Sequence, residues 1–175
     1  MATAATRFEV TASQTESEVI VGVQADIDAP IDVVWAVFHD FEHSPCFVKS
    51  LYSSHASPLG PEEWLVDRVG IVDLGLFNLH LGAKYRIHLD PILYRSQSQL
   101  ISGDVKSMQN TLQLTELDQD HTQLSSHAEV ETPAWFPKTW SQTLLVKQAR
   151  SAFQDMLNEV QKRATTHEAT ICPPR

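Results

Sequence analysis

The stretch that decides the fold is EVIVGVQADIDAPIDVVWAVFHDFEHSPCFV, residues 18–48. Its first part, Glu18 to Asp28, places apolar side chains at every second position, and this period of two is typical of a half-buried strand. The shared face holds Val19, Val21, Val23, Ala25 and Ile27. The strand ends at Asp-Ala-Pro. Because Pro30 suits the first turn of a helix and Asp32 suits its positive end, a helix is predicted to follow directly.

The predicted helix is short. Val34, Trp35 and Phe38 form its apolar side, and the pattern stops near Asp40. A second helical turn is predicted over residues 41–44, before Pro45. The chain therefore opens with one strand and two short helices.

Strand-like segments then follow one another with turn signals between them. We expect strands near residues 48–55, 63–72, 75–89, 94–101, 111–117 and 123–131. In the third of these, Phe77, Leu79, Leu81 and Tyr85 face one way, and polar residues face the other. Short turns between successive strands imply antiparallel pairing.

The chain closes with a long amphipathic helix that is predicted to end near Ala164. Its apolar stripe, spaced by three or four residues, is Leu145, Ala149, Phe153, Met156, Val160 and Ala164. The opposite side is expected to face solvent and carries Gln148, Gln154, Asp155, Asn158, Glu159 and Lys162. At about 1.5 Å per residue this helix would span about 40 Å, enough to cross a small domain.

These elements predict one α+β domain over residues 18–165, in which a curved seven-stranded antiparallel sheet wraps around the last helix. Residues 1–17 are small and polar, and we expect a mobile N-terminal arm there, with a weak organellar transit peptide as the alternative. Residues 166–175 are expected to form a frayed tail.

Charge and cysteine content narrow the function classes. The formal net charge is −9, which makes nucleic acid an unexpected partner. No apolar run reaches the length of about 18 residues that would span a bilayer, and no secretory signal is recognisable. Cys46 and Cys172 show no metal-binding spacing, so we expect two independent reduced thiols in a cytoplasmic protein.

The chain resembles the START-like, or SRPBCC, helix-grip superfamily, and within it the polyketide cyclase/dehydrase and lipid transport branch that includes coenzyme Q-binding proteins. The resemblance covers residues 18–165. It rests on DAPIDVVWAVFHDFEHSPCFV at 28–48, SGDVKSMQNTLQL at 102–114 with HTQLSSHAEV after it, and Pro137 before the final helix. It implies a cavity between the sheet and the last helix that holds lipids, isoprenoid quinones or polyketide-like molecules.

Three functions follow from this resemblance as alternatives. The first is binding, shuttling or chaperoning a hydrophobic small molecule without a cofactor. The second is a cofactor-free cyclase or dehydrase that uses the same pocket. The third is a regulator that binds a protein partner and has a filled pocket. No nucleophile elbow or metal-ligand spacing is present in the sequence, so neither catalytic nor metal-ligating residues are assigned. Contact with a membrane is expected to be transient at most.

The expected ligand site is a pocket of roughly 300–1,000 Å³. Its walls are predicted to be Phe77, Leu79, Leu81, Tyr85, Leu145, Ala149, Phe153 and Met156. Arg68 joins them if it points inward, where it would need a carboxylate such as Asp67 or Asp104, or a ligand head group. Trp135 and Phe136, which lie between two prolines, are predicted to form the pocket mouth with Met108.

Overall fold

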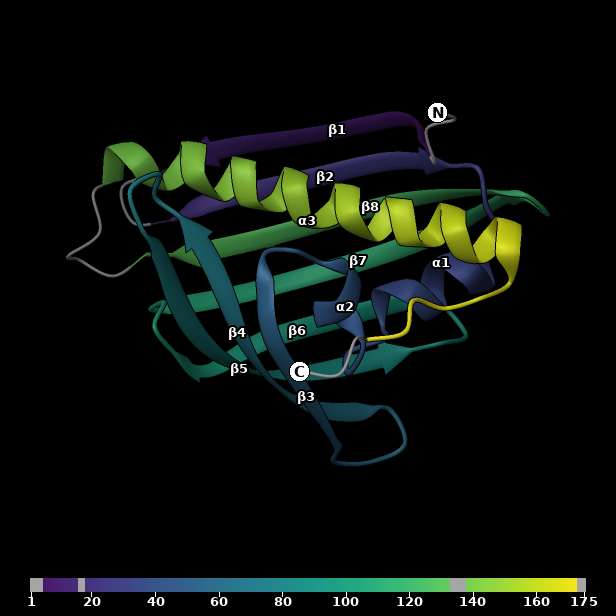
Figure 1. Cartoon of the computed structure of the whole chain (residues 1–175), viewed down its shortest axis with the longest axis horizontal. Helices are drawn as coiled ribbons and strands as arrows, with labels where there is room; N and C mark the ends of the chain where they lie inside the picture. The colour runs from purple at the N-terminus through teal and green to yellow at the C-terminus, as the bar shows by residue number, and fades with distance from the viewer. Residues whose placement is uncertain (1–4, 16–17, 133–137, 173–175) are drawn as a thin grey trace.

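The computed structural model describes residues 5–15, 18–132 and 138–172, and from residue 18 onward the strands and helices follow the predicted order (Figure 1). The elements are β1 (Ala5–Gln14), β2 (Val19–Ile27), α1 (Ile31–Phe38), α2 (Ser44–Phe47), β3 (Leu51–Pro58), β4 (Glu63–Asp73), β5 (Asn78–Asp90), β6 (Arg95–Gly103), β7 (Ser107–Asp118), β8 (His121–Glu131) and α3 (Lys138–Thr166). The α+β helix-grip prediction is confirmed. The second short helix includes Pro45, because the first turn of a helix needs no N–H at that position.

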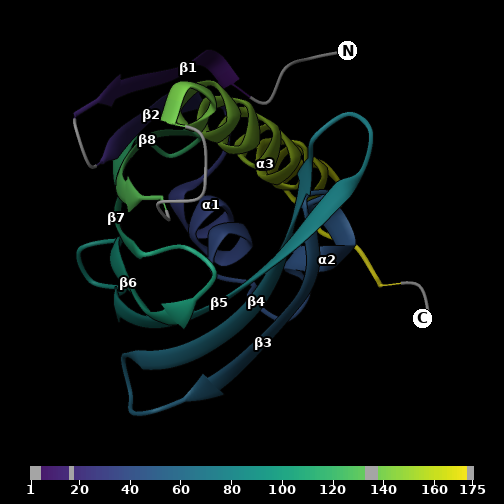
Figure 2. The same ribbon diagram turned by 90° about the vertical axis from the view of Figure 1, so that its left-hand side faces the viewer.

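All strands form one antiparallel sheet in the order β1-β2-β8-β7-β6-β5-β4-β3. The sheet curls around α1, and α3 lies across its open side (Figure 2). The predicted count of seven strands is wrong, because the expected N-terminal arm contains β1, which pairs with β2 along its length. Phe8, Val10 and Ala12 alternate with polar residues on β1 and pack into the core. This short apolar period is the reason that the segment forms an edge strand.

The main hydrophobic core lies between α1, α3 and the strands β1, β2, β7 and β8. Val34, Leu124 and Val160 are completely buried there. Helix α3 is fixed to the first strand by Gln142, whose Nε2 donates to the Ala12 carbonyl at 3.0 Å, and by Arg150, which lies over the Phe8 ring. The helix thus covers one half of the sheet.

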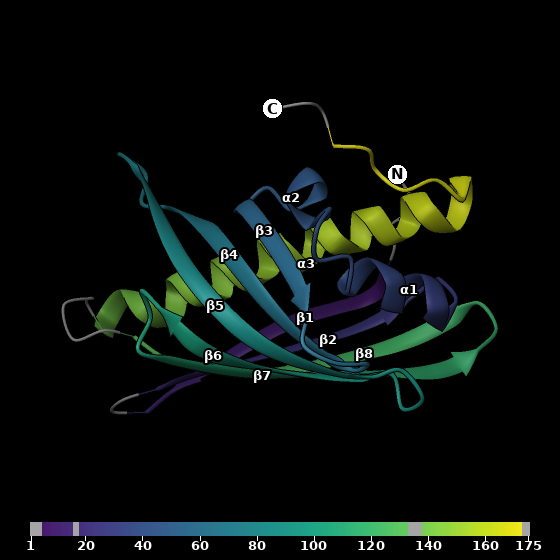
Figure 3. The ribbon, with the colours of Figure 1, turned by 90° about the horizontal axis from the view of Figure 1, so that it is seen from below.

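The far ends of β4 and β5 form a two-stranded ribbon that projects from the sheet. Strand β5 pairs with β6 only from Ala83 onward, whereas its residues 78–82 pair with β4 alone. Figure 3 shows these two ends rising away from the other strands. Leu74 N–H donates to the Phe77 carbonyl at 3.1 Å and closes the turn at the tip.

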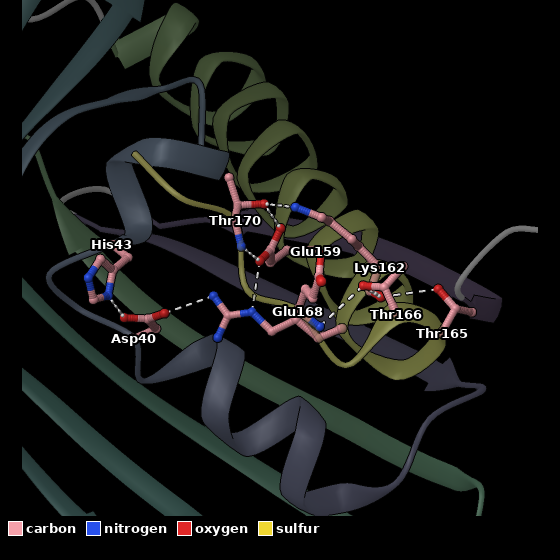
Figure 4. A network of polar contacts seen from close by, with 9 residues as sticks. Asp40, His43, Glu159, Lys162, Thr165, Thr166, Glu168 and Thr170 are labelled. Carbon is pink, nitrogen blue, oxygen red and sulfur yellow. Dashed lines mark hydrogen bonds and ion pairs between the residues drawn. The ribbon is translucent and has the colours of Figure 1, made fainter. Parts of the chain in front are cut away.

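A polar network fixes the C-terminal segment to the end of α3 (Figure 4). Glu159 accepts hydrogen bonds from the Thr170 backbone N–H at 2.8 Å and from Arg163 Nε at 2.7 Å. Arg163 also donates to Asp40 at 2.8 Å, and thereby ties the segment to the end of α1. Burial acts to raise the pKa of Glu159, but these hydrogen bonds outweigh it and lower the pKa. Glu159 is therefore buried and charged, contrary to the predicted solvent exposure.

The two cysteines are not independent thiols. Cys46 in α2 and Cys172 in the C-terminal segment form a disulfide, with Cα atoms 5.0 Å apart. The expectation of two reduced thiols rested on the absence of metal-binding spacing and is wrong, although the two cysteines are 126 residues apart in the chain. The fold brings them together because α2 packs against α3, where Asp155 accepts a hydrogen bond from Lys49 N–H at 2.9 Å.

Candidate functional site

Strands β4 and β5 turn one row of side chains each toward the inside of the curved sheet. On β4 this row includes Trp64, Val66 and Arg68, because Val66 is completely buried and side chains alternate between the two faces. On β5 the same face carries Tyr85, which packs with Val66 in the second core cluster. The sequence left the orientation of the Arg68 side chain open, and the structure shows that this side chain points inward.

Arg68 is held inside the protein by neutral groups. Its Nε donates to Ser54 Oγ on β3 at 3.3 Å, and its guanidinium lies 5.4 Å from the centre of the Phe41 ring. Burial lowers the pKa of Arg68, and the neighbouring Tyr85 opposes this shift. An arginine side chain is nevertheless always protonated in a protein. The inner face thus contains a permanent positive charge.

Neither of the predicted carboxylate partners reaches this charge. Asp67 points to the outer face, where it pairs with Lys84 at 3.4 Å, and Asp104 accepts a hydrogen bond from Gly82 N–H at 2.6 Å. Across the described residues, Arg68 has no carboxylate within ion-pair distance. A partly buried charge without a counter-ion is unfavourable, so this position favours an anionic or strongly polar ligand atom.

Tyr85 lies beside this charge and contacts Met108 on β7. Its hydroxyl donates to Met108 Sδ at 3.5 Å, which is a weak hydrogen bond. Burial raises the pKa of Tyr85, while the positive charge of Arg68 opposes the rise. At neutral pH the hydroxyl is therefore protonated and can donate to a ligand oxygen.

His39 and Ser96 form a second polar pair on the inner side. His39 follows the last turn of α1, where its Nδ1 lies 2.9 Å from the Trp35 carbonyl and its Nε2 lies 2.9 Å from Ser96 Oγ. A carbonyl can only accept, so Nδ1 carries the proton and Nε2 accepts from the Ser96 hydroxyl. Burial lowers the pKa of His39 to about 4, the hydrogen bond to Trp35 opposes this, and the charge of Arg68 adds to the lowering.

Sequence reasoning did not select His39 and Ser96 for this site. The nearby His43 does not join this pair, because its ring contacts Asp40. A usable signal was present: His39 follows Trp35 by four residues, which continues the apolar side of the helix. Ser96 carried no comparable signal, because serines alternate with glutamines along β6.

The predicted sheet wall is found in part. Leu79, Leu81 and Tyr85 lie on the inner face of β5 and are only partly buried. The predicted place of Phe77 in the pocket wall is wrong, because Phe77 lies in the turn before β5 and is 62% exposed. Asp73 accepts a hydrogen bond from Gly75 N–H at 2.7 Å, and Gly75 has a φ of 88°, so the chain turns before Phe77 can enter the strand.

The predicted helix wall packs against the main core. Leu145, Ala149, Phe153 and Met156 are partly buried against the cluster formed with β1, β2 and α1, and the rings of Phe153 and Phe38 are 5.6 Å apart. Trp135 and Phe136, the predicted mouth, lie outside the described residues. A closed pocket between these helix residues and β5 stays a prediction.

The outer face of the sheet has two polar hollows. The larger, about 460 Å³, is lined by Glu63, Arg86, His88, Gln97, Ser98, Gln99, Gln109, Asn110, Thr111, His127 and Glu129. The smaller, about 410 Å³, lies over β1, β2 and β8. In the larger hollow His88 and His127 each pair with a glutamate, at 3.1 and 3.3 Å. This face is hydrophilic, in contrast to the inner face.

Membrane-spanning helices and metal-binding clusters are both absent from the described ranges. Among those residues, no helix is long and apolar enough to cross a membrane. Within the same part of the chain, no three histidine, cysteine or acidic side chains gather in a way that could hold a metal ion.

Several solved structures share this fold. The chain is similar to the Zhui aromatase/cyclase from Streptomyces sp. R1128, with 17% identity, a TM-score of 0.75, and coverage of 87% of this chain and 99% of that one. It is also similar to a START superfamily protein from Mycobacterium smegmatis, with 15% identity, a TM-score of 0.68, and coverage of 82% and 97%. A third similar structure, TTHA0849 from Thermus thermophilus, has 15% identity, a TM-score of 0.70, and coverage of 86% and 99%.

At these identities the structures establish the fold alone, and no curated protein matches the chain. A family model described as "Polyketide cyclase / dehydrase and lipid transport" matches residues 27–160, which include the inner-face groups Arg68, Tyr85, His39 and Ser96. The chain belongs to the polyketide cyclase/dehydrase and lipid transport family.

Proposed function

We propose that this protein binds a hydrophobic small molecule on the inner face of β4 and β5, with a polar oxygen of that molecule against Arg68. The observation that carries the proposal is the inward guanidinium, which contacts Ser54 and Phe41 but no carboxylate among the described residues. A ligand oxygen would supply the missing acceptor. The apolar part of the ligand would lie along Leu79 and Leu81, which are only partly buried.

The chemistry of the site narrows the ligand class. Arg68 is a cation, the Tyr85 hydroxyl is a donor, and His39 is neutral at pH 7, so the inner face favours an acceptor or an anion over a cation. Lipid carboxylates, isoprenoid quinones and polyketide-like carbonyl or phenolate compounds all present such oxygens on an apolar body. Binding and transport of this class agrees with the lipid transport part of the family description.

A cyclase or dehydrase is the second candidate, and the proximity of Arg68 to Tyr85 favours it. A cation next to a substrate carbonyl stabilises the negative charge that develops on its oxygen during enolisation. Tyr85, with its raised pKa, would supply or receive a proton beside it. The same two residues that bind the ligand would then act on it.

The test compares two arginines that lie on opposite faces of neighbouring strands. Arg68→Gln removes the inward charge, and Arg86→Gln removes the outward charge that lines the larger polar hollow. Protein isolated from its own cells is weighed by native mass spectrometry to identify the bound molecule, and the affinity of both variants for that molecule is then measured. We expect a loss of at least tenfold for Arg68→Gln and no change for Arg86→Gln.

Three outcomes separate the candidate functions. A ligand that is released unaltered supports binding or transport. A ligand that is converted by the wild type, with the rate lost in Tyr85→Phe, supports the cyclase or dehydrase. Equal affinity in both arginine variants, or the absence of any bound molecule, would contradict the proposal and favour the regulator.

A further inference from the structure

The turn between β4 and β5 carries an exposed apolar surface that the proposed ligand site does not use. Leu76 is 97% exposed and Phe77 is 62% exposed. The turn is nevertheless ordered by hydrogen bonds, from Leu74 N–H to the Phe77 carbonyl and from Gly75 N–H to Asp73 Oδ1. A defined backbone therefore holds two large apolar side chains in water, where their exposure is unfavourable.

The ribbon that carries this tip is fixed to the helix beside it. Gln148 Nε2 on α3 donates to the Ile71 carbonyl at 3.1 Å. Lys147 lies 3.7 Å from Asp73, so the acidic residue nearest the tip already has a cationic partner. The base of the tip is consequently tied to α3, and the charge of Asp73 is balanced.

An apolar row connects the tip with the proposed ligand site. Leu79 and Leu81 follow Phe77 on the inner face of the ribbon, and Tyr85 lies further along the same face of β5. These side chains are partly exposed. An apolar molecule that moved from the tip along the inner face of β5 would therefore contact apolar side chains until it reached Arg68 on β4. The exposed tip and the site are therefore two ends of one surface.

We propose that Leu76 and Phe77 insert into the surface of a zwitterionic lipid bilayer, and that the ligand enters or leaves the protein along the inner face of the ribbon there. The exchange of a ligand at the membrane rests on the proposed function. The insertion of the tip has a physical basis of its own. Apolar side chains at a projecting turn gain free energy when they enter the acyl boundary of a membrane. The net charge of −9 opposes approach to anionic lipid, so the matching surface is an uncharged one.

The dimensions of the tip favour a bilayer over a protein partner. A stable protein interface buries about 800 Å² on each partner and involves about 20–30 residues. The tip is a projecting turn of the backbone (Figure 3) with two large exposed apolar side chains. A fluid apolar phase can surround a projecting turn from all sides, whereas a folded partner would need a preformed complementary pocket.

The experiment measures binding of the full chain to phosphatidylcholine vesicles by flotation, without added ligand. The test variant is Leu76→Ser with Phe77→Ser. The matched control is Ile92→Ser with Leu93→Ser, because these residues are 85% and 60% exposed in the turn at the other end of β5. We expect the tip variant to bind at least tenfold more weakly, a change of about 1.4 kcal/mol, and the control variant to bind like the wild type. Circular dichroism checks that both variants are folded.

Several results would contradict the proposed insertion of the tip into the bilayer. These are no vesicle binding by the wild type, equal loss in both variants, or binding that requires an anionic lipid such as phosphatidylglycerol. Dimerisation that depends on Leu76 and Phe77, seen by analytical ultracentrifugation, would instead assign the tip to a second copy of the chain. Because these measurements omit the ligand, they are independent of the affinity test on Arg68, and each proposal can fail alone.

Discussion

The two halves of the curved sheet differ in how their inner faces are covered. On β2 and β8 the inward residues Val23, Ala25 and Leu124 are at most 2% exposed. At the ribbon end of β5 the inward residues Leu79 and Leu81 remain partly exposed, although they occupy the same face of the same sheet. Helices α1 and α3 pack on the first half, and they account for this difference.

The chemistry of the two halves differs in the same way. The covered half is aliphatic and close-packed, as expected of a core that stabilises the fold. The open half combines aliphatic side chains with Arg68 and Tyr85, which offer donors to a ligand, and with Met108, whose sulfur accepts the Tyr85 hydrogen bond. We therefore assign the stability of the fold to the covered half of the sheet and ligand binding to the open half. Such a division is common where a functional site lowers the stability of the protein.

The largest expected difference in the free energy of unfolding is between variants of two leucines on the same inner face of the sheet. Leu124→Ala leaves a cavity in the covered half and should lower the free energy of unfolding by about 2–5 kcal/mol. Leu81→Ala should cost less than about 1 kcal/mol, because its side chain is already in partial contact with solvent. Urea denaturation measures both. Equal losses would show that the two halves are equally packed.

The next effect concerns pH and the neutral His39. Between pH 6.5 and about 4 the unfolded chain binds a proton at this residue that the folded protein excludes, so stability falls as the pH falls across this window. A pKa that drops from 6.5 to about 4 corresponds to about 3 kcal/mol. His39→Gln should remove this part of the slope when urea unfolding is compared at pH 7 and pH 4.5. An unchanged slope would place His39 in contact with solvent.

A smaller effect of opposite sign is expected for Arg68. Arg68→Met replaces a partly buried charge without a counter-ion by an apolar side chain of similar length, and should raise the free energy of unfolding by about 1 kcal/mol while ligand binding is lost. Arg86→Met on the outer face should change stability by less than about 0.5 kcal/mol. Thermal and urea unfolding give both values. A destabilised Arg68→Met would mean that Arg68 serves the fold and not a ligand.

The smallest effect on stability is expected for Tyr85→Phe. The hydroxyl loses only a weak hydrogen bond to Met108, so the free energy of unfolding should change by less than about 1 kcal/mol. Ligand affinity should fall by about tenfold or less, since one neutral donor is removed. A loss of more than about 2 kcal/mol in unfolding would assign Tyr85 to the core rather than to the open half.

Sequence periodicity predicted most of the fold, because each element has its own apolar pattern. The alternation on β2 and β5 and the stripe on α3 identified these elements without any knowledge of their partners. Strand β1 was missed, since Phe8, Val10 and Ala12 are few and stand among polar residues. The burial of Asp155 and Glu159 was also missed. It depends on segments distant in the sequence, namely the start of β3 and the C-terminal residues around Thr170.

The site was less predictable because it depends on which way side chains point and on contacts between residues that are far apart in the sequence. Arg68 was named from the sequence, but its direction required the registers Arg68↔Ala83 and Ser54↔Arg68. Phe77 fits the alternation of β5, and only the local turn chemistry of Asp73 and Gly75 removes it from the strand. His39 and Ser96 are 57 residues apart, so no local pattern relates them.

The pairing of β2 with β8 has a consequence for the synthesis of the chain. Val19 pairs with Val130 and Ile27 with Thr122, so β2 cannot complete its pairing until the ribosome has made nearly the whole domain. In that interval an unpaired strand rich in valine is a site for aggregation. Strand β1 is made immediately before β2 and pairs with its other edge. Strand β1 thus acts as an early partner, which covers one edge of β2 before β8 has been made to pair with the other edge.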